Sequence, residues 1–297
     1  MNSRLPVSML EQLPSWHAEL HLGFVRSGER TVLGENRHRG PLRVQKALYP
    51  EDEAVCQAIV LHPPSGIAGG DHLAISADIG AGAHAQLTTP GAGKWYRSRG
   101  AEASQRIDFT VAEGATLEWL PQETIVFDGA QARMETRVAL AADSRYIGWD
   151  ILCLGRAAAG ERFEYGHFDQ FYRVDRDNKP IWIERGGFYG NDPILSSPVG
   201  WADFTVCGTL LCSFPELPQQ ATGLLEACRA SAPSDAARHA LSALPGILVA
   251  RYLGDNSEAA RHWFTALWQI LRPACCPLKG LPLGRGRPAV IPRIWNT

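Results

Sequence analysis

The stretch ISADIGAGAHAQLTTP (Ile75–Pro90) decides the fold class, because the chain repeats its pattern. It aligns with IDFTVAEGATLEWLPQ (Ile107–Gln122) at an offset of 32 residues, and each copy has the pattern of a strand, a Gly-Ala turn and a second strand. A weaker third copy, RVALAADSRYIGWDIL (Arg137–Leu152), follows, with Asp143 placed 29 residues after Gly114. One strand-turn-strand hairpin cannot bury its own face, so the repeat predicts stacking of several units. We therefore predict a mainly β fold of stacked antiparallel or mixed β-sheet layers, built from these repeated units.

The residues around the repeat support short strands. The 29 glycines and 20 prolines divide the chain into short segments, which favours strands and tight turns over long helices. Apolar residues also alternate with polar ones, as in a strand with one buried face. The alternating apolar positions are Leu73, Ile75, Ala77 and Ile79 in one segment, and Ile107, Phe109 and Val111 in another.

The pattern changes in the C-terminal third, where we expect a few α-helices. Leu217–Ala243 is rich in alanine and leucine, with helix signals on either side of Pro233. A second helix is predicted to begin at a capping box formed by Asp255 and Glu258 and to end before Pro273. Its apolar residues form one stripe that is expected to pack on the sheets. The stripe consists of Ala260, Trp263, Phe264, Leu267, Trp268 and Leu271.

These patterns predict one domain over residues 1–297, since no linker divides the chain. We expect residues 1–16 to be flexible and residues 217–273 to form the helical part. Residues 274–297 are rich in proline and glycine, and we expect them to lie on the domain as an extended C-terminal strap.

Composition argues against several classes of protein. The net charge of −2 offers no electrostatic surface for nucleic acid. No run of eighteen uncharged apolar residues is present, so no membrane span is expected. The N-terminal segment contains Glu11 and lacks the apolar core of a signal peptide. Seven scattered cysteines without a CxxC pair argue against a structural zinc site or a disulfide framework. A cytoplasmic location is predicted.

The loop HPPSGIAGGD (His62–Asp71) could be a phosphate cradle, a metal site, a catalytic turn or only a tight connection. A phosphate cradle needs a following helix and usually a lysine, but Gly66, Gly69 and Gly70 precede an alternating strand pattern. Ser65 lacks the G-x-S-x-G context of a nucleophile elbow. A metal site and a tight turn remain open.

Two metal arrangements are compatible with the sequence. His62, Asp71 and His84 could hold the ion of a metal-dependent hydrolase. Alternatively, carboxylates on the predicted strands could bind an ion loosely and pass it on, because oxygen ligands hold divalent first-row ions less tightly than thiolate and imidazole do. These carboxylates are Asp71, Asp78, Asp150 and Glu184. They could also be ordinary surface and turn residues. The pair Cys275–Cys276 cannot easily close a tetrahedral site alone, so packing beside Pro277 is favoured.

Six segments, in order along the chain, resemble the family of urease accessory proteins called UreD or UreH. The resemblance extends from about residue 17 to the C-terminus, and several of the motifs are long and chemically unusual. They are HPPSGIAGGD (His62–Asp71), TTPGAGKWYRS (Thr88–Ser98), LEWLPQETIVFDGA (Leu117–Ala130), ILCLGRAAAGE (Ile151–Glu161), ARYLGD (Ala250–Asp255) and PRIWNT (Pro292–Thr297).

The resemblance implies a β-rich chaperone or scaffold in urease maturation without catalytic activity of its own. Members of the family bind UreF, and through it the GTPase UreG, and they dock on the urease apoprotein so that nickel reaches its metallocentre. The resemblance therefore implies no tightly bound cofactor, Ni²⁺ as a transient cargo, and a dimer of the chain as one arrangement within the accessory complex. It implies a polar internal passage, to which we assign Asp71, Asp150 and Glu184, all within the range of the chain that the resemblance covers.

Overall fold

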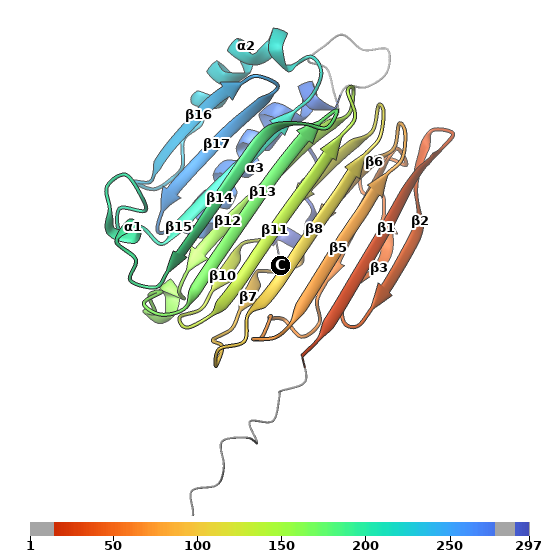
Figure 1. The fold of residues 1–297 in the computed structure, drawn as a ribbon. Helices are drawn as coiled ribbons and strands as arrows, with labels where there is room; N and C mark the ends of the chain where they lie inside the picture. Colours follow the sequence, from red (N-terminus) through yellow and green to blue (C-terminus); the bar gives the residue numbers. More distant parts are fainter. Residues whose placement is uncertain (1–14, 277–288, 297) are drawn as a thin grey trace, which may run out of the picture.

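The structure is a computed structural model, and it describes residues 15–276 and 289–296. Within these residues the strands form two sheets that lie face to face (Figure 1). Sheet A contains, in spatial order, β14 (Lys179–Tyr189), β13 (His167–Arg176), β11 (Gln131–Leu140), β8 (Ala103–Val111), β5 (His72–Ile79), β1 (His17–Ser27) and β2 (Arg30–Arg39). Sheet B contains β16 (Arg238–Leu244), β17 (Ile247–Gly254), β15 (Val206–Ser213), β12 (Arg145–Leu154), β9 (Thr116–Leu120), β6 (His84–Thr88), β4 (Val55–Leu61) and β3 (Arg43–Leu48), with β10 (Thr124–Val126) and β7 (Gly93–Trp95) attached beside β12.

The sequence repeat corresponds to the registers of both sheets. In sheet A, Ile75 of β5 pairs with Ile107 of β8, which is the offset of 32 found in the sequence. In sheet B, Leu87 of β6 pairs with Trp119 of β9 at the same offset. The third unit follows 29 residues later in both sheets, where β11 and β12 join the stack. Repeated units therefore stack as parallel coils, and the prediction of a mainly β fold with stacked sheets is confirmed.

The prediction that each unit is a hairpin is wrong. β5 pairs with β1 and β8, whereas β6 pairs with β4 and β9, so the two strands of one unit lie in different sheets. The turn between them carries the chain from one sheet to the other. Gly82 and Gly114 adopt positive φ of 68° and 63° in successive turns, a conformation that glycine takes at little cost. Antiparallel pairing of β2 and β14 at the edges of sheet A, and of β15 with β12 inside sheet B, makes both sheets mixed.

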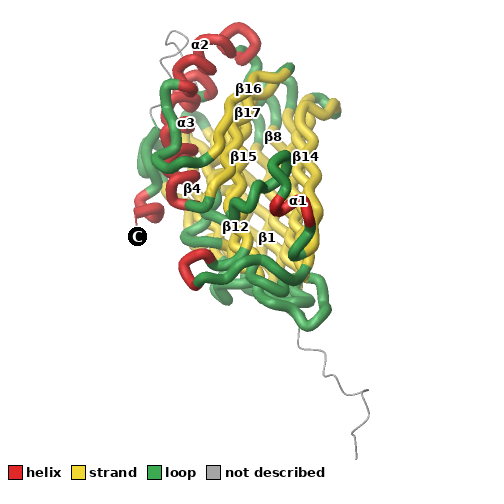
Figure 2. Tube along the Cα trace, turned by 90° about the vertical axis from the view of Figure 1, so that its left-hand side faces the viewer, coloured by secondary structure: helices red, strands yellow, loops and turns green. Residues whose placement is uncertain are grey.

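Two apolar cores hold the layers together. The first lies between the sheets, where alternate side chains of each strand meet. The second lies on the outer face of sheet B, which is covered by α2 (Leu217–Arg229) and α3 (Ser257–Cys275), as Figure 2 shows. Every residue of the apolar stripe predicted for the second helix, which is α3, is buried in this second core. The prediction that the stripe packs on the sheets is confirmed. The short elements are η1 (Ala157–Ala159), α1 (Pro193–Ser196) and η2 (Arg293–Asn296).

Several boundaries of the predicted helical part differ from the structure. β16 and β17 lie between α2 and α3, so the range 217–273 is not wholly helical. The segment before Ala243 forms β16 instead of a helix, because its backbone pairs with β17 along the edge of sheet B. Asn256, not Asp255, caps α3, by accepting hydrogen bonds from the amides of Glu258 and Ala259. The helix also continues through Pro273 to Cys275.

The terminal predictions fall partly outside the described residues. Residues 1–14 of the segment expected to be flexible lie outside them, as do residues 277–288 and 297 of the expected strap. Residues 274 and 275 belong to α3, and residues 293–296 form η2. The Trp295 indole is buried in the second core, and its Nε1 donates a hydrogen bond to Thr88 Oγ1 at 2.8 Å.

Candidate functional site

Three loops meet at one end of the stacked coils. They follow the parallel strands β4, β6 and β9, and the carboxyl ends of such strands lie at the same edge of a sheet. Backbone hydrogen bonds join the first loop to the second, from the Ile67 amide to the Lys94 carbonyl at 2.7 Å. A further bond joins the second to the third, from the Gly93 amide to the Glu123 carbonyl at 2.9 Å. The loop His62–Asp71 is therefore one part of a rim shared by three coils.

Asp71 stabilises the first of these loops. One carboxylate oxygen accepts a hydrogen bond from the Ala68 amide at 2.8 Å, and the other accepts one from the Trp16 amide at 2.9 Å. The side chain is buried, and the residue is 7% exposed. Its oxygens thus hold the turn and the chain just before β1. This geometry corresponds to the tight-turn interpretation of the loop.

Beneath the rim, the two sheets enclose a cavity of about 280 Å³. Its wall includes His62 and Ser65 from the first loop and Lys94 from the second. Burial lowers the pKa of His62, although the charge of Asp71 opposes that shift. Apolar side chains form much of the remaining wall, among them Leu73, Ile75, Ile107, Trp119 and Met134. At its inner part the cavity reaches Asp150 and Tyr172.

Asp150 lies in a polar cluster between the sheets. It pairs in register with Thr209 on β15, which pairs with Arg251 on β17, so the three side chains point from sheet B toward sheet A. Sheet A contributes Gln170 and Glu184 to the same space. We call these five residues the interior polar cluster.

Hydrogen bonds form two groups within this cluster, one at the cavity wall and one toward the surface. Gln170 donates to the Asp150 carboxylate, and Arg251 donates to the Glu184 carboxylate. Thr209 Oγ1 accepts from Arg251 Nη1 at 2.9 Å and lies 3.3 Å from Glu184 Oε2. The Arg251 side chain is 41% exposed, so the cluster runs from the cavity wall to solvent. Burial, together with the nearby charge of Glu184, raises the pKa of Asp150 to about 7.

The structure thus brings two of the three predicted passage residues together. Asp150 and Glu184 share the interior polar cluster, whereas Asp71 lies in the rim loop and is occupied by backbone amides. Their partners Gln170, Thr209 and Arg251 were not predicted. Arg251 lies in the segment ARYLGD, which was a signal that could have identified it.

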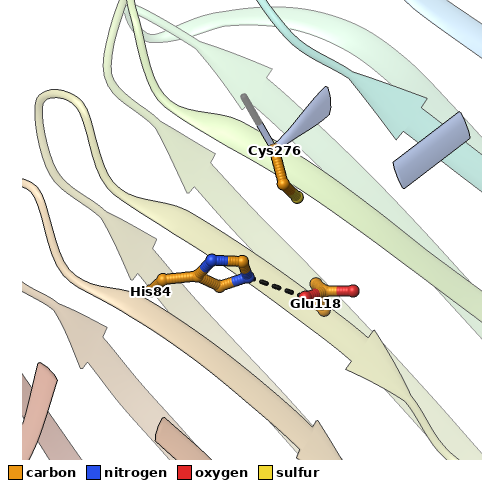
Figure 3. Close-up of side chains that lie close together, drawn as sticks. All are labelled: His84, Glu118 and Cys276. Atoms are coloured by element: carbon orange, nitrogen blue, oxygen red, sulfur yellow. Dashed lines mark hydrogen bonds and ion pairs between the residues drawn. The ribbon is translucent and has the colours of Figure 1, made fainter. Parts of the chain in front are cut away.

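The residues of the hydrolase alternative are not assembled. His62 faces the cavity between the sheets, but the His84 ring donates a hydrogen bond to the Glu118 carboxylate on the face covered by α3. Among the residues that the structure describes, the group able to offer three metal-ligating atoms is His84, Glu118 and Cys276, which includes neither His62 nor Asp71 (Figure 3). Cys276 thus lies close to His84 and Glu118. Pro277, beside which the cysteine pair was expected to pack, lies outside the described residues.

The similarity of this chain to known proteins extends over nearly its whole length. A family model described as UreD urease accessory protein matches residues 17–296. The chain belongs to the UreD family of urease accessory proteins. A protein of Dechloromonas aromatica (strain RCB) called urease accessory protein UreD is 77% identical over the full length of both chains.

Two further UreD relatives are less similar but nearly as complete. That of Azoarcus sp. (strain BH72) is 51% identical over 96% of this chain and 95% of its own. That of Nitrosococcus oceani is 50% identical over 98% of this chain and 94% of its own. In the described part of this UreD-family chain, no helix has the length and apolar character required to cross a bilayer.

Proposed function

We propose that this chain is a scaffold for urease maturation that assists the delivery of Ni²⁺ to the urease apoprotein. It acts without catalysis of its own, in a complex with UreF and, through UreF, the GTPase UreG. The membership of the chain in the urease accessory family supports the process, and the interior between the sheets supports the route. All seven cysteines are free thiols, which supports a reducing cytoplasm as the compartment.

The observation that carries this proposal is the continuity of the cavity with the interior polar cluster. Asp150 belongs to both, because it forms part of the cavity wall and accepts the hydrogen bond from Gln170. Glu184 follows Asp150 toward the partly exposed Arg251. Carboxylate, amide and hydroxyl oxygens thus continue from the inner cavity wall to the partly exposed Arg251.

The chemistry of this route suits transfer of an ion more than storage. Carboxylate, hydroxyl and amide oxygens bind a divalent first-row ion less tightly than a set of thiolates and imidazoles does. An ion in transit must be bound well enough to enter and weakly enough to leave. Asp150 and Glu184 supply charge along the route, while Asp71 contributes by holding the loop at its mouth.

Arg251 gives the unloaded route a counter-charge. Its guanidinium lies against Glu184 and also donates to Thr209. An arriving divalent ion competes with this tethered cation for the carboxylate. The arrangement therefore keeps the interior charges paired when no cargo is present.

Urease activation at limiting nickel tests the proposal. Wild-type chain, Asp150→Ala and Glu184→Ala are each produced with urease and the other accessory proteins, and both the nickel content of urease and the composition of the purified complex are measured. We expect intact complexes and a loss of nickel in urease for both variants. Asp78→Ala is the matched control, since this exposed carboxylate lies on sheet A outside the cluster. Normal nickel loading by both interior variants would show a purely structural partner and refute the route.

A further inference from the structure

The face of sheet B opposite the passage holds a second polar centre. His84 begins β6 and Glu118 lies in β9, and the paired positions of these strands place both side chains on one face. Helix α3 covers that face and presents Trp268, Arg272 and, just after its end, Cys276. These three residues are spaced by four, so they lie on one side of the helix.

His84, Glu118 and Cys276 converge on a common point. Figure 3 shows the three side chains directed toward one another, and one ligand atom of each lies within 4.8 Å of the others. His84 Nε2 and Glu118 Oε1 are 2.6 Å apart. All three residues are buried, with exposed fractions of 8%, 0% and 3%. An imidazole, a carboxylate and a thiol are therefore concentrated in a site closed to bulk water.

The surroundings orient the carboxylate. Trp268 Nε1 donates to Glu118 Oε2 at 2.6 Å, and Arg272 Nε donates to the same oxygen at 3.0 Å. Outer partners of this kind fix the direction of a ligand and strengthen binding at metal centres. Oε1 is bound by the His84 ring and also accepts from Arg272, with Nε at 3.1 Å and Nη2 at 3.0 Å. The His84 bond is the one that an ion between the two side chains would replace, and Arg272 would continue to hold the carboxylate.

The charges of the centre are suited to a divalent cation. A carboxylate and a thiolate together neutralise such an ion, and a neutral imidazole adds no charge, so the loaded centre needs no further counter-ion. Arg272 remains paired in that state, because its Nη2 also donates to both oxygens of Glu51, at 2.8 and 3.0 Å. Insertion of an ion requires the His84 nitrogen and the Glu118 oxygen to separate from 2.6 Å to about 3.3 Å, for bonds near 2.0–2.1 Å in tetrahedral geometry.

We infer that His84, Glu118 and Cys276 form a binding site for one late first-row divalent transition-metal ion, separate from the passage. A mixed set of nitrogen, oxygen and sulfur ligands suits Zn²⁺, Ni²⁺ or Co²⁺ better than Mg²⁺ or Ca²⁺, which prefer oxygen. Three protein ligands leave a fourth position open for water. The ion would connect two strands of sheet B to the end of α3.

Titration of the metal-free full chain with Co²⁺ tests this site. The thiolate of Cys276 should give a sulfur-to-cobalt charge-transfer absorption that saturates at one ion per chain. Cys276→Ser should abolish this absorption, and His84→Gln should weaken binding at least tenfold. Cys228→Ser is the matched control, because this buried cysteine lies on α2 and should leave the absorption unchanged. Asp150→Asn should also bind Co²⁺ normally, so failure of the passage does not affect this test.

An absence of the absorption in the wild-type chain, or its persistence with unchanged affinity in Cys276→Ser, would overturn the inference. Circular dichroism establishes whether each variant is folded. If a ligand variant does not fold, X-ray absorption of the wild-type chain loaded with one equivalent of Zn²⁺ decides the matter. We expect one sulfur and at least two nitrogen or oxygen neighbours; a shell without sulfur would refute the site.

Discussion

The Asp150 carboxylate on sheet B accepts a hydrogen bond from the Gln170 amide on sheet A, so a neutral donor joins the two sheets across the interior. The nearest cation of the cluster, Arg251, instead donates to Glu184. Asp150 thus lies between the sheets beside a second carboxylate and has no hydrogen bond to a guanidinium. This explains why its pKa is raised to about 7, into the range where small changes of pH alter its charge.

Asp150→Asn should remove a pH dependence of stability. The folded state binds the Asp150 proton more tightly than the unfolded chain, so this contribution to stability is complete below about pH 4 and is lost as the pH rises through about 7. The variant should therefore be more stable than wild type by about 1–3 kcal/mol at about pH 8, and nearly equal to it at about pH 4. Urea unfolding at both pH values measures the difference. Asp78→Asn changes an exposed carboxylate outside the cluster and should not reproduce the gain in stability at about pH 8. A difference between Asp150→Asn and wild type that is the same at both pH values would contradict the expectation.

Arg251→Met should destabilise the fold by about 1–2 kcal/mol, because Glu184 then faces Asp150 without its counter-charge. The loss is smaller than at a fully buried pair, since the Arg251 side chain is partly exposed. Glu184→Gln in the same chain should recover part of the loss. A double-mutant cycle by urea unfolding measures the coupling, and additive effects of the two changes would show that the pair is not coupled.

The fold was largely predictable from the sequence, but the path of the chain between the sheets was not. The offsets of 32 and 29 residues indicate stacked units, and they reappear as the registers of neighbouring parallel strands, because equivalent residues of stacked coils occupy equivalent positions. A short turn containing Gly82, however, can close a hairpin or carry the chain to a second sheet. The choice depends on burial against distant strands, which no local pattern records. β16 was missed for a related reason: its alanine and leucine residues favour a helix, and only pairing with β17 makes them a strand.

The candidate site was predictable only in part. Asp150 and Glu184 are assigned through the resemblance to a known family, yet their environment depends on residues from three other strands. Gln170, Thr209 and Arg251 are distant from one another in the sequence, and sheet pairing brings them together. Asp71 is the opposite case. Its place in a glycine-rich loop suggests a functional carboxylate, but in the structure both of its oxygens accept hydrogen bonds from backbone amides.

Glu118→Gln should weaken the attachment of α3 to sheet B. Glu118 is fully buried and is bound by His84, Trp268 and Arg272, so removing its charge should cost about 3–5 kcal/mol at neutral pH. Arg272 and His84 hold the pKa of this carboxyl well below its usual range. Its stabilising contribution is therefore present above the ordinary carboxyl pKa and is lost as the pH falls through the lower value in the folded state.

Urea unfolding across the acid range checks this expectation. The difference between wild type and Glu118→Gln should shrink as the pH falls. Glu258→Gln serves as the control, since that side chain lies exposed in the first turn of the same helix and should change stability by less than about 0.5 kcal/mol. A difference that stays constant with pH would mean that the charge of Glu118 is not what holds α3.

Gly69→Ala should disturb the rim loop, whereas Gly91→Ala should not. A Cβ at position 69 would lie 2.2 Å from Ser98 Oγ and 2.9 Å from the Ala101 carbonyl oxygen, two atoms already hydrogen-bonded to each other. The strain should cost about 1–3 kcal/mol. A Cβ at position 91 meets no atom within 4 Å, so that change should stay within about 0.5 kcal/mol. If the rim is the mouth of the passage, Gly69→Ala should also lower nickel loading of urease at limiting nickel, while Gly91→Ala loads it normally. If Gly69→Ala is less stable but both variants load urease with nickel equally well, the shape of this loop does not matter for delivery of the ion.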